Sequence, residues 1–346
     1  LIVYDTLGNS AIANGSIRHQ NLNDLYFDIT LQPENFTCLN TNRYQNEVFY
    51  GNGIVTGEVR FYGPADDFHI DANVNTAKGT DIVIPLNNSI TITENDFVIF
   101  MNEEKEEDQF LQQYNVDIKG LSLDFSININ NTAELMIFLP SNMGNITSKG
   151  FGDIRFTINP RGQFNIYGDY NFLRGTFFFS FQNMINRRFE ILQGGQISFA
   201  GNPYNADVRL KALYRQKTSL SGLGANISPE LEGERVNVNT FLGLRGKLAN
   251  PEIRFSIDFP NVRPEIKQTI FAILDTTDKA LMNQQVLSLL LLNSFTYASA
   301  SANMSASSLN IISSQLSNWL SQISNDFDIG INYIAGDELT QDCLLY

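Results

Sequence analysis

Histidine and cysteine are almost absent from this sequence. Among 346 residues there are two of each, and the cysteines, Cys38 and Cys343, lie at opposite ends of the chain. A disulfide framework or a zinc site needs several such residues at short spacings. A catalytic triad or metal centre built on histidine has only His19 and His69 to use. We therefore expect no bound metal, no other cofactor and no enzymatic activity.

Positive charge is also scarce. The 23 Lys and Arg residues are outnumbered by 37 Asp and Glu, which gives a net charge of −14 at pH 7. Neutralising the phosphates of a nucleic acid requires clustered basic side chains, and none are clustered here. The sequence therefore disfavours nucleic-acid binding, and the same deficit argues against electrostatic docking on anionic lipid headgroups.

Long apolar runs and a leader sequence are missing as well. The longest apolar run, residues 287–292, is interrupted by Ser288 and is far shorter than the ~20 residues of a membrane-spanning helix. The chain begins with residues typical of a strand and lacks the basic N-terminal region of a signal peptide. We expect a fragment of a longer protein, with any targeting or anchoring segment before Leu1.

The dominant positive signal is an alternation of apolar and polar residues that continues to about Pro260. This pattern is typical of strands with one apolar face, and it is clear over residues 121–129, 163–172 and 253–259. Turn sequences such as residues 159–162 separate the strands, with no long helical pattern between them. An open sheet of this size must close, split or curl. The sequence therefore predicts a mostly β protein, an elongated and curled antiparallel or stacked sheet that forms a taco-like or tube-like groove with an apolar interior.

Helical spacing replaces the alternation after Pro260. Apolar residues recur at i, i+4, i+5 and i+8 over residues 266–274, and further helical stretches follow over about 278–293 and 309–323. Alternation returns near the end of the chain. The predicted division is an elongated β-groove over 1–260, an amphipathic helical segment over 261–325 and a terminal strand region over 326–346.

An ordered series of glycine-containing strand motifs runs through the second half of the sequence. The motifs are Gly-Phe-Gly-Asp-Ile-Arg-Phe at 150–156, Gly-Gln-Phe-Asn-Ile-Tyr-Gly-Asp-Tyr at 162–170, Phe-Glu-Ile-Leu-Gln-Gly-Gly at 189–195, Gly-Asn-Pro-Tyr-Asn-Ala at 201–206, Gly-Leu-Arg-Gly-Lys-Leu-Ala-Asn-Pro at 243–251 and Gly-Asp-Glu-Leu-Thr at 336–340. Together they resemble the C-terminal region of the TamB family, of the translocation and assembly module, over about residues 115–342. The asparagine-rich, acidic composition resembles that of the Bacteroidota branch of the family.

The resemblance implies a location and partners. Members of this family are periplasmic, with an inner-membrane anchor, here outside the fragment, and a C-terminal end at the outer membrane. The implied partner is an outer-membrane barrel of the TamA or BamA kind or its lipoprotein counterpart. The implied roles are phospholipid movement to the outer membrane and help in barrel-protein assembly.

The first functional hypothesis is a lipid groove. Inward-facing apolar side chains would hold acyl chains without polar recognition, because each CH₂ moved out of water gains about 0.8 kcal/mol. The candidate lining residues are Phe164, Ile166, Tyr170, Phe172, Phe177, Phe179, Phe181, Phe189, Ile191, Ile197, Phe199, Val208, Leu210, Phe255 and Ile257. The alternative is that these side chains pack against one another as the core of a sandwich.

The second hypothesis is a scaffold that docks on the barrel and assists outer-membrane protein assembly. Exposed barrel edges recruit strands, and the candidate strand carries Phe327, Ile329, Ile331 and Tyr333. A third interpretation, that the chain is itself an outer-membrane barrel, fits the alternation but not the three amphipathic helices or the lack of aromatic girdles.

Overall fold

The computed structural model describes residues 1–20, 23–46, 49–86, 120–181, 185–223, 234–274, 276 and 278–295. These residues are mostly in strands, with two short helices late in the chain, so the predicted mostly β class is confirmed. They form two compact units. Unit 1 comprises Leu1–Leu213 and Leu244–Pro251, and unit 2 comprises Tyr214–Gly243 and the chain from Glu252 onward.

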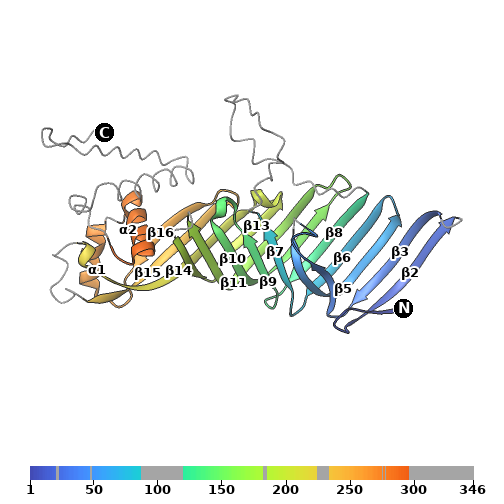
Figure 1. The fold of residues 1–346 in the computed structure, drawn as a ribbon, viewed down its shortest axis with the longest axis horizontal. Coiled ribbons are helices and arrows are strands. Elements are labelled where there is room, and N and C mark those ends of the chain that lie inside the picture. The colour runs from blue at the N-terminus through green and yellow to red at the C-terminus, as the bar shows by residue number, and fades with distance from the viewer. Residues whose placement is uncertain are drawn as a thin grey trace, which may run out of the picture. The chain divides into compact units, whose positions relative to one another are not determined.

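The strands of unit 1 lie mainly before residue 213. They are β1 (Ile2–Tyr4), β2 (Ser10–Gln20), β3 (Asn23–Pro33), β4 (Phe36–Thr41), β5 (Tyr50–Pro64), β6 (Phe68–Thr76), β7 (Asp81–Pro85), β8 (Leu121–Ile129), β9 (Glu134–Phe138), β10 (Gly144–Ile158), β11 (Phe164–Phe181), β12 (Ile185–Ile191) and β13 (Gln196–Gly201). The strands β14 (Asp207–Ser219) and β15 (Arg235–Lys247) contribute residues to both units. Figure 1 shows β2, β3, β5, β6 and β8 lying side by side.

The hydrogen-bonded order in unit 1 is β1-β2-β3-β5-β6-β8-β10-β11-β12-β14, with β4, β7, β9 and β13 beside this path. The register pairs between these strands are antiparallel, except that β6 pairs with β8, and β7 with β9, in parallel. The prediction of a largely antiparallel sheet therefore agrees with the observed pairing.

Long strands of this sheet alternate with interrupted ones. One edge of β5 pairs with β6 and then with β7, and β10 in the same way pairs with β8 and then with β9. At these interruptions, threonine hydroxyl groups accept hydrogen bonds from the backbone. Thr80 Oγ1 accepts from the Ile54 amide at 3.1 Å, and Thr76 Oγ1 accepts from the Asn130 amide at 3.0 Å. A register shift at Lys149/Gly150 in β10 adds an irregularity of the kind that bends a strand. The sheet can therefore curl while its ladders stay paired.

The register places apolar side chains in continuous rows on one face of the sheet. One row crosses six strands in the order Leu31, Val59, Ala72, Phe125, Phe156 and Ile166, each paired with the next. The neighbouring row contains Ile29, Phe61, Ile70, Leu123, Ile158 and Phe164. The register row between these two, one residue along each strand, contains Thr30, Arg60, Asp71, Asp124, Thr157 and Asn165. Because side chains alternate along a strand, the sheet has one apolar face, called the inner face below, and one polar outer face.

Unit 2 contains β16 (Glu252–Asp258), α1 (Pro264–Leu274) and α2 (Lys279–Leu292) beside its parts of β14 and β15. Pro264 begins α1, where its fixed φ and missing N–H are tolerated. The buried ring of Phe259 contacts those of Phe271 and Phe295, with centroids 5.8 and 6.1 Å away. The predicted helical stretch over 309–323 and the terminal strand region lie outside the described residues.

Candidate functional site

The inner face of β3, β5, β6 and β8 is only partly covered. Val55, Val59 and Val74 form its buried floor, and the partly buried side chains of Leu31, Phe61, Ile70, Ala72 and Ile127 pack around them. Phe27, Phe68 and Phe125 on the same face are also half-buried. We call this surface, from Phe27 in β3 to Ile127 in β8, the open trough.

Small residues are frequent on the inner face of β5 in the open trough. Four of the seven inner positions of β5 are glycine, namely Gly51, Gly53, Gly57 and Gly63, and Gly57 pairs with Val74 and Gly63 with Phe27. A glycine contributes no side-chain volume to the space above the sheet. Apolar surface is accessible beside a floor that is itself buried.

The inner face of β11 to β14 in unit 1 is completely covered instead. The predicted lining residues here are 0–8% exposed, and they are Phe164, Ile166, Tyr170, Phe172, Phe177, Phe179, Phe189, Ile191, Ile197, Phe199, Val208 and Leu210. Phe177 pairs with Phe189, Ile197 pairs with Tyr170 and Val208, and the rings of Phe177 and Phe179 are 5.9 Å apart. We call this part the filled section, since its side chains pack against one another.

The other predicted lining residues are placed differently. Phe181 ends β11, and its side chain lies outside what the structure describes. Phe255 and Ile257 are buried in β16, which belongs to unit 2. The predicted barrel-contact residues, Phe327, Ile329, Ile331 and Tyr333, lie outside the described residues.

A buried polar pair shows how dense the filled section is. Tyr170 and Ser148, 1% and 2% exposed, share a hydrogen bond of 3.2 Å between their hydroxyl groups. Burial raises the pKa of Tyr170 to about 12, because the charged phenolate would lose its hydration. The ring also lies against Gly150, where an added Cβ would be 2.7 Å from Tyr170 Cζ. The backbone and the tyrosine ring leave no space for even a methyl group at this point.

Four phenylalanine rings lie at the boundary between the open trough and the filled section. Phe156 in β10 contacts Phe125 in β8 at 4.6 Å and Phe164 in β11 at 6.1 Å between ring centroids. Phe49, which precedes β5, lies 5.5 Å from Phe156 and 6.1 Å from Phe164. These separations are typical of aromatic contact. We call Phe49, Phe125, Phe156 and Phe164 the aromatic cluster.

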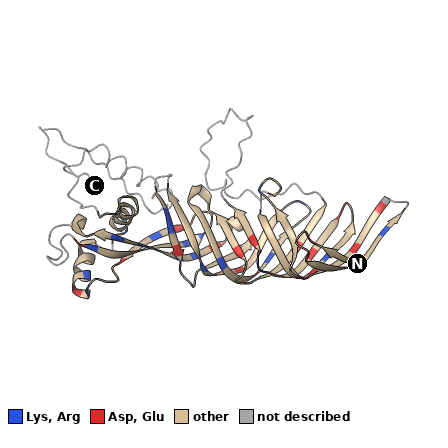
Figure 2. Ribbon diagram, turned by 60° about the horizontal axis from the view of Figure 1, so that its bottom comes forward, with Lys and Arg blue, Asp and Glu red and all other residues tan. Residues whose placement is uncertain are grey.

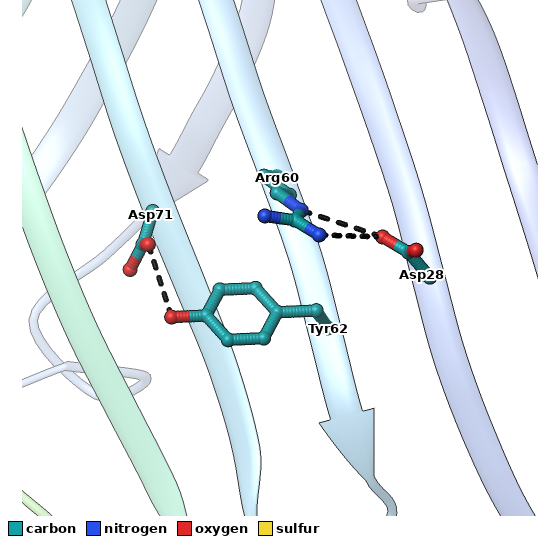
Figure 3. A network of polar contacts seen from close by, with 4 residues as sticks. All are labelled: Asp28, Arg60, Tyr62 and Asp71. Carbon is teal, nitrogen blue, oxygen red and sulfur yellow. Dashed lines mark hydrogen bonds and ion pairs between the residues drawn. The ribbon is translucent and has the colours of Figure 1, made fainter.

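The outer face carries exposed ion pairs and hydrogen bonds. Arg60 donates from Nε and Nη2 to Asp28 Oδ1 at 3.3 and 3.1 Å, and Tyr62 donates to Asp71 Oδ2 at 3.1 Å (Figure 3). Acidic and basic residues are interspersed along the strands (Figure 2). This face is therefore suited to water, in contrast to the open trough.

A second outer-face pair joins β8 and β10. Arg155 donates to both carboxylate oxygens of Asp124, at 2.8 and 2.5 Å. The hydrogen bonds from Arg155 lower the pKa of Asp124, because they favour the charged carboxylate. The pair lies directly behind the inner-face row that contains Phe125 and Phe156.

The residues of the open trough were missing from the candidate list although their signal is visible. The alternation in residues 59–61, 70–74 and 121–129 places Phe61, Ile70 and Leu123 on an apolar face. Alternation reports which face a side chain occupies but not what lies above it. The list therefore favoured the aromatic-rich sequence of β11, whose side chains are covered by one another.

Two further properties concern the described ranges only. Within them, no three His, Cys, Asp or Glu side chains are grouped so that they could hold a metal ion. Neither described helix is long and apolar enough to cross a bilayer.

The sequence matches a known family over nearly all of its length. The family model is that of the TamB C-terminal domain, and it matches residues 3–342. No curated protein matches the chain in sequence. The chain therefore belongs to the TamB family, whose members have periplasmic, outer-membrane-associated roles in outer-membrane assembly or lipid transport.

Proposed function

We propose that this TamB-family chain conveys phospholipid toward the outer membrane by holding acyl chains in its apolar interior, with the open trough as the accessible binding surface. The observation that carries the proposal is the pair of in-register apolar rows across β3, β5, β6 and β8, whose side chains are half-buried except for the buried Val59. Contiguous exposed apolar surface is unusual on a monomeric soluble protein and marks a binding site. A role without enzymatic chemistry is part of the proposal.

The residue composition of the open trough supports acyl chains as its ligands. Its rows consist of Leu, Ile, Val, Ala and Phe side chains, with no charged residue in register between Leu31 and Ile166. Each buried CH₂ contributes about 0.8 kcal/mol wherever it lies along such a wall. An acyl chain would therefore be held without a fixed position, which suits a surface along which lipids move.

Membership of the TamB family supports the proposed setting. The proposed partner is an outer-membrane barrel of the TamA or BamA kind or its lipoprotein counterpart, with the C-terminal end of the protein at the outer membrane. Phe327, Ile329, Ile331 and Tyr333 remain the proposed strand for contact with the barrel.

The experiment is native mass spectrometry of the chain purified from a bacterial envelope, combined with lipid extraction. Ile70→Asp places a charge on the inner face of β6, and Asn73→Asp places the same charge on the exposed outer face of the same strand. We expect wild type and Asn73→Asp to retain phospholipid and Ile70→Asp to lose it. Circular dichroism must show that both variants keep the strand content of the wild type.

A second candidate function is supported by the filled section. Its side chains are 0–8% exposed and pack as a core, which favours a scaffold that docks on a barrel and assists outer-membrane protein assembly. A folded wild-type protein that carries no phospholipid would exclude the conduit and favour this scaffold.

A further inference from the structure

We infer that the aromatic cluster closes one end of the open trough, and that Phe49 is the ring that keeps bound acyl chains away from Phe164 and the filled section. The inference rests on the proposed lipid-binding function, because it defines where along the inner face a chain can lie. It divides the predicted lining surface into a part that contacts lipid and a part that does not.

Phe49 reaches across the trough. It precedes β5, whereas Phe156 and Phe164 belong to β10 and β11, and β6 and β8 separate β5 from β10 in the sheet order. Three strand spacings in a flat sheet amount to about 14 Å. The ring centroids of Phe49 and Phe156 are only 5.5 Å apart. The segment before β5 therefore places the Phe49 ring against Phe156 and Phe164.

The four rings of the cluster form a continuous set of contacts. Phe49 and Phe164 are stacked with an interplanar angle of 28°, and Phe125 meets Phe156 edge-on at 67°. Each ring of the cluster is within 6.1 Å of another. A chain that lies along the row from Leu31 toward Ile166 would meet these rings before it reached β11.

Side-chain exposure changes at the same place. Phe125 and Phe156 are half-buried, like the aromatic residues Phe27, Phe61 and Phe68 of the open trough, but Phe164 is 5% and Ile166 is 4% exposed. Beyond them, Tyr170 lies against Gly150 and is 1% exposed. The filled section therefore offers no surface to an acyl chain in this conformation.

The cluster contains one member that is not part of a strand. Phe125, Phe156 and Phe164 are fixed by ladder pairs to their neighbours, whereas Phe49 lies before the first residue of β5. Removing the Phe49 ring is therefore the substitution that uncovers Phe156 and Phe164 without changing a ladder residue.

Photo-crosslinking tests the inference. The full chain is mixed with vesicles of phosphatidylethanolamine and phosphatidylglycerol that contain a phosphatidylethanolamine with a diazirine in its acyl chain, and the crosslinked residues are mapped by peptide mass spectrometry. In the wild type we expect crosslinks along the open trough, at Phe61, Ile70 and Leu123, and at least about tenfold fewer at Phe177 and Ile197, a ratio equivalent to about 1.4 kcal/mol.

Two matched variants isolate the role of Phe49. Phe49→Ala should raise crosslinking at Phe164 by about tenfold. Phe27→Ala removes a ring of the same size from the open trough, where it contacts Phe68 at 5.3 Å, and should leave Phe164 unlabelled. Equal changes at Phe164 in both variants would overturn the assignment of Phe49.

The outcomes separate the inference from the function on which it rests. Crosslinks of equal intensity in the open trough and the filled section of the wild type would overturn the inference and leave lipid binding intact. An absence of crosslinks throughout the chain would overturn the proposed function itself. The wild-type map decides between these outcomes even if a variant does not fold.

Discussion

Strands β8 and β11 carry the same alternation of apolar and polar residues but end in different environments. Leu121, Leu123 and Ile127 on the inner face of β8 are half-buried, whereas Tyr170, Phe172 and Phe177 of β11 are 1% exposed or less. Both strands belong to unit 1 and both pair with β10. The difference therefore lies in how far the inner-face side chains of each strand are covered, and not in the alternation itself.

Residue volume accounts for the difference. The long strand of the open trough, β5, has four glycines at inner positions, while β11 has aromatic residues at most of its inner positions. The aromatic side chains of β11 also contact one another, as do the rings of Tyr170 and Phe172 at 5.4 Å. The filled section is therefore filled by aromatic side chains, which the inner face of β5 has only at Phe61.

The largest expected difference is in the response to truncation. Phe177→Ala should lower the free energy of unfolding by about 3–5 kcal/mol, because it leaves a cavity in a packed core. Phe61→Ala, in the open trough, should cost about 1–2 kcal/mol, since its half-buried ring gains only part of the full burial energy. Urea unfolding followed by circular dichroism measures both variants. Equal losses would mean that the two regions are packed alike.

Enlargement of small residues should give the next largest effect. Ala212→Leu adds volume where the side chain is 0% exposed and should cost about 1–3 kcal/mol through overpacking. Ala72→Leu adds the same volume to the open trough, where its side chain is half-buried, and should leave the free energy of unfolding nearly unchanged. Thermal unfolding of the two variants provides the test. A larger loss for Ala72→Leu would contradict an open trough.

Much of the fold could be predicted from the sequence, because strand periodicity is a local property. Alternation in residues 121–129 and 163–172 assigned the apolar faces, and Pro260 marked the change to helical spacing. The parallel pairing of β6 with β8 could not be predicted, since strand order depends on contacts between distant segments. The distinction between open and filled parts was also missed, although the glycines of β5 and the phenylalanines of β11 are visible in the sequence. Interpreting them requires the register that places them on the same face.

A smaller effect is expected from the buried hydroxyl pair of the filled section. Tyr170→Phe should cost about 1 kcal/mol at neutral pH, since it leaves Ser148 without its tyrosine hydroxyl partner. Tyr62→Phe is the matched control, because its hydroxyl donates to Asp71 on the solvated outer face, and it should cost less. Chemical denaturation at pH 7 compares the two. A greater loss of unfolding free energy in Tyr62→Phe than in Tyr170→Phe would contradict the burial of the Tyr170 hydroxyl.

Alkaline pH should distinguish the same variants. The pKa of Tyr170 is raised to about 12 in the folded protein, and that of an unperturbed tyrosine is about 10. The folded protein therefore retains this proton between pH 10 and 12 while the unfolded chain releases it. The stability that the proton contributes is complete below pH 10 and is lost as the pH rises toward 12. Tyr170→Phe should lose less stability over this range than the wild type. Equal losses of stability in Tyr170→Phe and the wild type would show that the Tyr170 hydroxyl is hydrated in the folded protein.

The smallest expected effect concerns the outer face of the open trough. Arg60 and Asp28 are 52% and 40% exposed, so Arg60→Gln should cost about 0.2–1 kcal/mol, and the loss should shrink as salt screens the pair. A double-mutant cycle with Asp28→Asn at low and high salt separates the pairwise energy from the loss of packing against Tyr62, whose ring centroid is 4.9 Å from Arg60 Cζ. If the coupling energy between Arg60 and Asp28 exceeded the loss of unfolding free energy in Phe61→Ala, the ion pairs of the outer face would be the main stabilising contacts of the open trough. The apolar rows would then be free to serve a ligand at little cost to the fold.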